Sequence, residues 1–175
     1  GQLRAGETAN LAPPQIEGVW DFKVSFLLPE GSEVRAGQPV IGFDATELER
    51  RLEQRRSEAQ TAATELDQRR NDLARSRQEL ALQLAEAEAR LRRLDLELEV
   101  PPELMAAVER DKVQIDHELA AKEVEALRRK TQLEETSARA ELGALDERRR
   151  QALARVAELE RGIAAMRVAA PRSGI

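Results

Sequence analysis

The sequence predicts a mostly α-helical fold in which a long antiparallel two-helix coiled-coil hairpin is inserted into a small β unit. Of the 175 residues, 35% are charged and only 2% are aromatic, a composition typical of long helices rather than of one large globular core. Apolar residues recur every seven positions after residue 45, and Pro101-Pro102 interrupts the pattern near the middle of the chain. Together these observations indicate two helical arms joined by a turn.

The first 44 residues have the character of a small β unit. They contain all three Phe, the only Trp and six of the nine Gly. Residues 19–28 and 34–43 are rich in β-branched and aromatic side chains, and a turn-forming sequence, Pro29 to Ser32, separates them. We therefore expect two or three short strands before the hairpin, too few to close a core alone.

Residues 45–98 contain neither Gly nor Pro and form the predicted first arm. One apolar line has the seven-residue spacing of a coiled-coil seam: Leu52, Ala59, Leu66, Leu73, Leu80, Ala87 and Leu94. The companion line, offset by four residues, consists of Arg56, Ala63, Arg70, Arg77, Leu84, Leu91 and Leu98. Because arginines dominate its first half and leucines fill its second, we expect the distal half of the seam to be the better packed. Asp44 is predicted to cap the arm, with Glu47 returning a hydrogen bond in a capping box.

The first arm ends at Pro101-Pro102, since proline lacks an amide proton and disfavours helical dihedral angles in the preceding residue. The second arm ends with two interleaved apolar lines, which are Leu145, Ala152, Leu159 and Met166, and Leu142, Arg149, Val156 and Ile163. Such lines predict one apolar stripe at the base of the arm, facing the first arm.

The register of the hairpin follows if the two arms start and finish together. Pairing Ala45 with Met166 places Leu98 opposite Val113, so the hairpin spans residues 45–166 and its tip about 99–112. Each arm is then about 80 Å long. Residues 167–175 read as a strand that meets a Pro-containing turn, and we expect this piece to pair with the first β unit across the base of the hairpin.

Composition excludes several classes of function. Acidic and basic residues are interspersed and the net charge is −5, so no basic face is available for nucleic acid. The chain has no Cys and a single His, His117, which we expect to be a surface residue without a metal or catalytic partner. We expect no enzymatic activity and no cofactor. No apolar run approaches the roughly 20 residues that cross a bilayer, so any membrane anchor is expected outside these residues.

Two short segments resemble a known family. Residues 30–38 read EGSEVRAGQ and lead to Asp44, and residues 170–175 read APRSGI. They are similar to the two halves of the split lipoyl-like domain of HlyD-type membrane fusion proteins, the periplasmic adaptors. The first half in that family reads Glu-Gly-polar-x-Val-x-x-Gly-Gln and closes with Asp, and the second opens Ala-Pro-x-x-Gly-Ile/Val. Both segments occur here in the family's order, around a coiled-coil hairpin.

The resemblance implies a domain organisation and a function. Residues 1–44 would hold an N-terminal segment and the first half of a lipoyl-like (barrel-sandwich hybrid) domain, 45–166 the hairpin, and 167–175 the start of the second half, which is incomplete in this fragment. The chain would belong to a non-catalytic periplasmic adaptor. It would link an inner-membrane transporter, ABC-type or proton-driven, to an outer-membrane TolC-like channel for efflux or secretion. The family also implies a homo-oligomer that is associated with the inner membrane through parts outside this fragment.

The resemblance does not extend to the carrier function of true lipoyl domains. Those carriers place an acceptor lysine on the turn between their two halves, where this chain carries the whole hairpin. The residues that enter the hairpin, 43–46, include no lysine.

The candidate docking residues lie near the predicted turn. Adaptors that dock onto TolC-like channels resemble one another in an Arg, a Leu four residues later and a Ser seven beyond it, and Arg90 and Leu94 match the first two while Pro101 replaces the Ser. An apolar cluster follows, and exposed clusters of this kind usually mark contacts. The candidate set is Arg90, Leu94, Val100, Pro101, Pro102, Leu104, Met105 and Val108.

A structural coiled-coil scaffold with a β-rich head is the alternative function. A continuous parallel dimer would need its heptads to run through Pro101-Pro102, whereas an intramolecular hairpin turns back there. The alternative also gives no reason for the two matched β segments.

Overall fold

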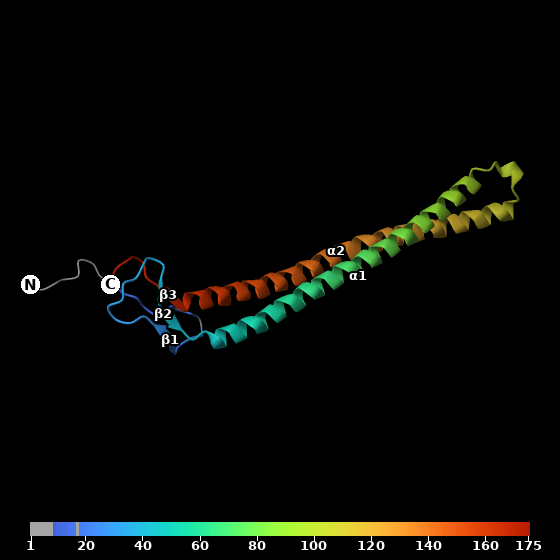
Figure 1. Ribbon diagram of the computed structural model, residues 1–175. Coiled ribbons are helices and arrows are strands. Elements are labelled where there is room, and N and C mark those ends of the chain that lie inside the picture. The colour runs from blue at the N-terminus through green and yellow to red at the C-terminus, as the bar shows by residue number, and fades with distance from the viewer. Residues whose placement is uncertain (1–8, 17) are drawn as a thin grey trace, which may run out of the picture. The chain divides into compact units, whose positions relative to one another are not determined.

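The computed structural model describes residues 9–16 and 18–175, without the side chain of Pro102. Part of the predicted N-terminal segment, residues 1–8 and 17, therefore lies outside the described residues. The elements are strands β1 (Val24–Leu27) and β2 (Pro39–Phe43), helix α1 (Thr46–Leu98), the 3-10 helix η1 (Pro102–Leu104), helix α2 (Ala107–Ala165) and strand β3 (Arg167–Ala169) (Figure 1). Two long helices in a hairpin and a small antiparallel sheet confirm the predicted fold class.

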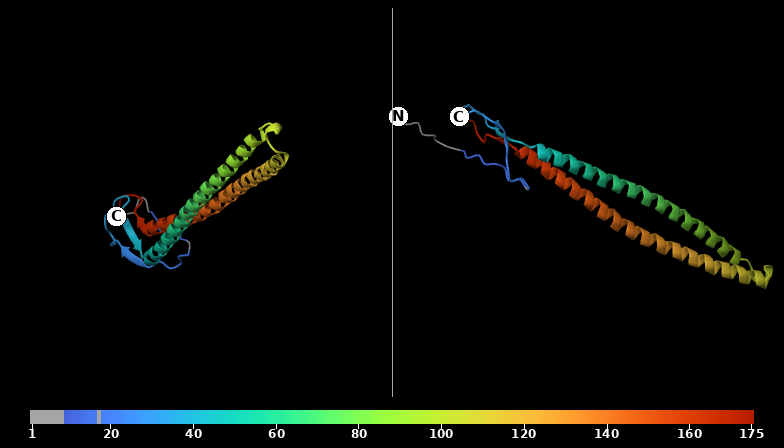
Figure 2. Two further views of the ribbon diagram at one scale, coloured as in Figure 1. Left: turned by 90° about the vertical axis from the view of Figure 1, so that its right-hand side faces the viewer. Right: turned by 90° about the horizontal axis from the view of Figure 1, so that it is seen from below.

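The chain divides into two compact units. The base unit takes the residues up to 62 together with 149–175, and the distal unit takes residues 63–148. The base unit holds the sheet and the root of the hairpin. The distal unit holds the remainder of both helices and the turn that joins them (Figure 2).

The sheet of the base unit joins segments from both sides of the hairpin. β2 lies in the centre and pairs antiparallel with β1 on one side and with β3 on the other. The amide of Phe43 donates to the carbonyl of Met166 at 2.9 Å, directly where the two helices meet the sheet. The expected pairing of the two β pieces across the hairpin base is thus confirmed.

The two segments that carry the family resemblance are hydrogen-bonded to each other. Val34 and Gly174 exchange backbone hydrogen bonds of 2.8 and 3.0 Å in an isolated antiparallel bridge, and the amide of Gly37 donates to the carbonyl of Ala170 at 2.8 Å. The hydroxyl of Ser173 accepts from the amide of Ala36 at 3.0 Å. Residues separated by the whole hairpin therefore form one local structure.

Two glycines of the first segment are required by the turns in which they lie. Gly31 and Gly37 have φ angles of 80° and 81°, and each is the third residue of a four-residue turn closed by a backbone hydrogen bond. A positive φ at that position is the mark of a type II turn, which favours glycine because a side chain would clash with the backbone.

The strands are shorter than expected. Residues 19–23 are not in a strand, and the carbonyl of Lys23 instead accepts a 2.8 Å hydrogen bond from the amide of Asp44. The turn at residues 35–38 interrupts the second predicted strand, so that its regular part begins at Pro39. Both strands are therefore shorter than β-propensity alone predicts, because turns end the regular strand pairing.

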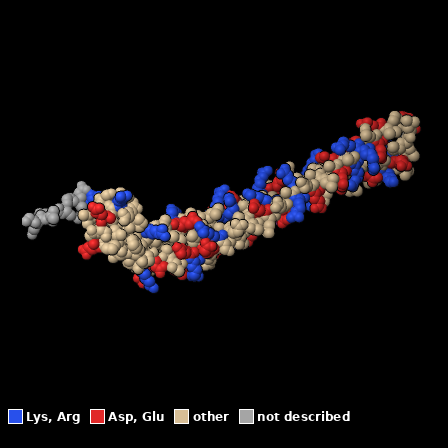
Figure 3. All heavy atoms as spheres, in the orientation of Figure 1, with Lys and Arg blue, Asp and Glu red and all other residues tan. Residues whose placement is uncertain are grey.

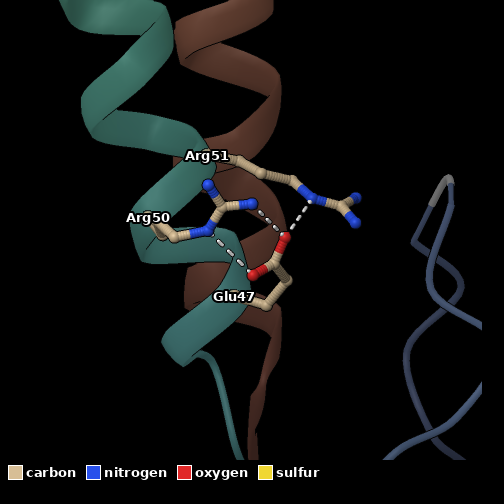
Figure 4. Close-up of polar contacts among 3 residues, drawn as sticks. All are labelled: Glu47, Arg50 and Arg51. Carbon is tan, nitrogen blue, oxygen red and sulfur yellow. Dashed lines mark hydrogen bonds and ion pairs between the residues drawn. The ribbon is translucent and has the colours of Figure 1, made fainter.

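Only half of the predicted capping box forms. Asp44 Oδ1 accepts from the amide of Thr46 at 3.0 Å and from its hydroxyl at 2.7 Å, and these bonds hold the pKa of Asp44 below its usual value. The expected return bond from Glu47 is wrong, because the Asp44 amide already donates to Lys23. Glu47 instead accepts from Arg50 at 2.9 and 3.0 Å and from Arg51 at 3.0 Å (Figure 4).

Glu47 is predicted to titrate unusually low. The hydrogen bonds from Arg50 and then Arg51 lower its pKa from 4.5 to about 2. A lowered pKa stabilises the folded chain above pH 4.5, and that contribution is lost as the pH falls through about 2. In an NMR titration of the side-chain carboxyl, Arg50→Ala should raise the pKa of Glu47 toward 4.5. Arg55→Ala, which removes a partner of Glu58 instead, should leave it near 2. A Glu47 pKa that ignores Arg50→Ala would contradict this arrangement.

The predicted seam line is buried along most of α1. Leu52, Ala59, Leu66, Leu80, Ala87 and Leu94 are all buried, and Leu73 is half-buried. Near the turn, Leu94, Val113 and Ala120 form a core cluster on which Leu91 and Leu98 pack. The expected register, with Leu98 opposite Val113, is therefore confirmed.

The predicted companion line is wrong in the first half of α1. Arg56, Arg70 and Arg77 are exposed. The buried companion positions are instead Leu48 and Ala62, which lie three residues after a position of the seven-residue repeat, not four. Arg55 and Arg69 lie on the same offset-three line and are half-buried, so the first half of the seam keeps polar side chains. The core cluster lies in the distal half, and the better packing expected there stays a prediction. The companion line changes offset between Leu73 and Leu84, where Leu84, Leu91 and Leu98 take over in the distal half.

This change of offset creates a discontinuity inside the distal unit. The positions that face α2, which are Ser76, Leu80 and Leu84, follow one another at steps of four and four, where a regular heptad alternates three and four. Such a stutter locally unwinds the supercoil. An open cavity of about 480 Å³ lies there, with Leu73, Leu80, Ala138 and Leu142 in its wall. Ser76 donates to Glu134 at 3.3 Å across the gap, so a polar contact replaces an apolar one.

The stutter is predicted to be the weakest part of the seam. Leu66 is 1% exposed, so Leu66→Ala should lower the free energy of unfolding by about 3 kcal/mol. Leu73 lines the open cavity and is only half-buried, so Leu73→Ala should cost about 1 kcal/mol. Urea unfolding followed by circular dichroism measures both. Equal losses would mean that the seam is uniformly packed.

The two glycines of α2 have different surroundings. A Cβ at Gly143 would have no heavy atom within 4 Å, whereas one at Gly162 would lie 3.3 Å from Ile16 Cγ2. Gly162 is buried, and because it has no side chain, Ile16 can pack against the root of the hairpin there.

Replacement of the two glycines should separate helix propensity from packing. Gly143→Ala should stabilise the chain by about 1 kcal/mol, the usual gain from Ala inside a helix. Gly162→Ala should gain less or lose stability, because Ile16 must move. Thermal unfolding of both variants, with Ile16→Ala added to Gly162→Ala as the control, tests this. Equal gains at the two sites, with no effect of Ile16→Ala, would show that Ile16 does not pack there.

Candidate docking site at the hairpin tip

The turn of the hairpin is built by helix-breaking residues and one arginine. α1 ends at Leu98, and residues 99–106 connect it to α2 through the single turn of η1. The amide of Leu104 donates to the carbonyl of Pro101 at 3.0 Å, which closes η1. Arg110 reaches back from the first turn of α2, and its Nη1 donates to the carbonyl of Val100 at 3.3 Å. The turn is thus tied to both helices.

The candidate apolar residues of the turn differ in exposure. Leu104 is 77% exposed and Val108 is 82% exposed. Pro101 is exposed as well, whereas Val100 and Met105 are half-buried. The side chain of Pro102 lies outside the described part of the chain. Leu104, Val108 and Pro101 therefore leave apolar surface exposed, and Val100 and Met105 are partly covered by the turn.

Arg90 and Leu94 lie on α1 below the turn and are placed differently. Leu94 is 5% exposed and belongs to the core cluster with Val113 and Ala120. Its side chain packs the seam and is not available on the surface. Arg90 is exposed, and its Nη1 lies 2.9 Å from Glu123 Oε2 of α2. Any contact that Arg90 makes with a partner must compete with this ion pair.

One pair near the turn was missed by sequence reasoning. His117 Nε2 lies 2.7 Å from Asp95 Oδ1, and the imidazole is only 29% exposed. His117 is therefore half-buried at the edge of the seam, where its side chain contacts α1. The available signal was its position four residues after Val113, on the inward face of α2. The pair fixes the level at which the two helices meet below the turn.

The wider surface of the helices is charged without a dominant sign. Figure 3 shows basic and acidic side chains mixed over both helices. Most ion pairs are exposed, and a bidentate pair of Arg69 with Glu141, at 2.7 Å for both bonds, bridges the helices beside the stutter. Among the described residues, no group of three or more potential ligands could hold a metal ion. Neither long helix has an apolar stretch able to cross a membrane, within the residues described.

Comparison with known proteins gives a distant structural likeness. No protein-family model and no curated protein matches the chain. Among solved structures, the chain is similar to one described as the structure of the periplasmic adaptor protein EmrA, with a TM-score of 0.36 and 16% sequence identity. The match covers 87% of this chain and 61% of that one, so this chain spans less than two thirds of the length of that protein.

Proposed function

We propose that this chain is part of a periplasmic adaptor that links an inner-membrane transporter to an outer-membrane TolC-like channel. The proposal rests on two features. A split β unit is closed by segments on either side of a hairpin, and the turn of that hairpin exposes apolar side chains. The chain acts through geometry, as a spacer and docking element, and makes or breaks no bond.

The split β unit is the observation that carries the proposal. The motif segments 30–38 and 170–175 are the ones that resemble the two halves of a lipoyl-like domain, and they are hydrogen-bonded to each other through Val34, Gly37, Ala170 and Gly174. A long insertion that leaves such a unit intact must enter and leave at adjacent points. The bond from Phe43 to Met166 holds those points together.

The tip supplies the docking element of the proposal. Leu104 and Val108 present apolar side chains at a turn that Arg110 holds in place. The turn does not bury these two apolar side chains. Exposed apolar side chains that lie close together usually mark a contact with a partner. Since Pro101 stands where related adaptors carry a Ser, the contact proposed here is apolar and needs no hydroxyl.

The scaffold alternative is less well supported. The two helices are antiparallel within one chain and meet through pairs such as Asp95 with His117. A parallel two-chain rod would place these residues far apart. The transporter class and the cargo are not part of the proposal, since both ABC-type and proton-driven partners suit an adaptor of this kind.

Replacement of the exposed tip residues tests the proposal. Leu104→Glu combined with Val108→Glu, in the full-length protein, should reduce capture of a purified TolC-like channel and export by about tenfold or more, since about 1.4 kcal/mol of lost contact energy already has that effect. Both side chains are exposed, so helix content by circular dichroism should be unchanged.

The matched control is Leu153→Glu, an exposed leucine on α2 in the base unit. It adds the same kind of charge away from the turn and should leave capture and export intact. Normal capture and export by the tip variant, with an intact hairpin, would show that the turn is only a cap and that the channel contact lies elsewhere. Absence of both capture and export in the unaltered full-length protein would contradict the adaptor role.

A further inference from the structure

The packing between α1 and α2 lapses over one stretch of the distal unit. Leu66 and Leu80 of α1 are buried, but none of residues 70–79, all of which are described, is buried, and Leu73 is only half-buried. The open cavity of about 480 Å³ is lined by this stretch and by the facing part of α2. We name residues 70–79 of α1 and 131–140 of α2 the gap segments.

Ion pairs between the helices enclose the gap segments on both sides. On the side of the base, Nε and Nη2 of Arg69 donate to the two carboxylate oxygens of Glu141, each at 2.7 Å. On the side of the turn, Nη2 of Arg128 lies 2.7 Å from Oε1 of Glu88. The two helices are therefore held to each other just before and just after the gap segments.

The polar contacts across the gap segments are longer, and one of them can be exchanged. Ser76 donates to Glu134 at 3.3 Å, and Arg77 lies 3.5 Å from Glu135. Glu135 also lies 3.7 Å from Arg139 of its own helix. If the helices separate here, Glu135 keeps a cation partner on α2. Because an exposed ion pair contributes at most about 1 kcal/mol, loss of the contact with Arg77 costs little.

The sequence of α2 favours bending at the gap segments. Both helices run through them without a break (Figure 2). The hydroxyls of Thr131 and Thr136 donate to carbonyls four residues earlier, those of Leu127 and Gln132, each at 2.9 Å. Bonds of this kind often bend a helix. Gly143 follows shortly after, and glycine leaves the backbone more conformational freedom than any other residue.

We propose that the gap segments form a hinge, at which the distal end of the hairpin tilts while both helices stay intact. A hinge lies where few contacts must break and where the parts on either side move as rigid bodies. The buried seam around Leu66 and around Leu80 supplies those rigid parts. The inference goes beyond the adaptor function, since bending requires neither a channel nor a transporter.

A tilt at this place displaces the turn of the hairpin. The turn lies about 35 Å beyond the centre of the gap segments, at 1.5 Å for each helical residue. A tilt of about 20° therefore moves it sideways by about 12 Å, roughly the diameter of one helix. The exposed residues Leu104 and Val108 would move with it.

Distances between two spin labels on α2 test the hinge directly. The chain has no cysteine, so Ala126→Cys with Ala144→Cys places one label on each side of the gap segment, at exposed positions. Five helical turns separate the two positions, so both labels lie on the same side of the helix, about 27 Å apart. A bend of about 20° changes that distance by about 2 Å. Double electron–electron resonance measures how widely the distance is distributed.

The matched control is Val108→Cys with Ala126→Cys, which has the same spacing on the same helix and does not cross the gap segment. The distribution for residues 126 and 144 should be wider than that of the control by about 2 Å, the change that such a bend produces. Equal widths for the two pairs would overturn the proposal.

Filling the gap should remove the movement. Ser76→Leu adds an apolar side chain at the cavity and should narrow the distribution for residues 126 and 144 to the width of the control. Ser137→Leu adds the same side chain at an exposed position of the α2 gap segment and should leave the distribution wide. Gly143→Ala, which stiffens α2, should narrow it as well. A distribution that neither Ser76→Leu nor Gly143→Ala narrows would contradict the hinge.

Hydrogen exchange separates bending from local unfolding. In a hinge between intact helices, amides of the gap segments stay hydrogen-bonded and should exchange far more slowly than in an unfolded chain. Exchange there at the unfolded rate would show that the helices melt, and would overturn the proposal. Neither measurement uses a channel or a transporter, so a failure of the adaptor function would leave both results unchanged.

Discussion

The structure depends on one buried apolar line that holds two helices of the same chain together. From Leu52 to Leu94, every seventh residue of α1 faces α2. The line consists of five leucines and two alanines, and all of them are buried except the half-buried Leu73. The stability of the hairpin is therefore spread along the seam, and a defect such as the stutter weakens only the packing around it. The level at which α1 and α2 meet in the distal unit, on which the tip depends, follows from this line.

The base unit is held together by contacts of a different kind. A β unit of three short strands cannot close a core alone, and its two halves are separated by more than a hundred residues of hairpin. Backbone bonds from Val34 and Gly37 to the C-terminal segment join them. Gly31 and Gly37 make this possible, because the type II turns require positive φ angles. The residues of the two motif segments are thus those that the turns and the backbone pairing require.

Sequence reasoning recovered the features that follow from strong periodicity or from backbone chemistry. The seam line, the break at Pro101-Pro102 and the pairing of the β segments belong to this class. It missed the change of offset, because arginines at both candidate offsets made the companion line ambiguous; the apolar residues Leu48 and Ala62 were the usable signal. It assigned Leu94 both to the seam line and to the candidate docking set, and the burial of Leu94 in the core cluster leaves only the first assignment.

The level at which the two helices meet is the central claim, and one measurement addresses it directly. Asp95→Cys and His117→Cys in the same chain, treated with a short bis-maleimide at low micromolar concentration, should give a product linked within one copy, since the native side chains lie 2.7 Å apart. Mass spectrometry should find residues 95 and 117 joined in a single chain. Links formed only between copies, or links from residue 95 to a distant part of α2, would contradict the hairpin and its register.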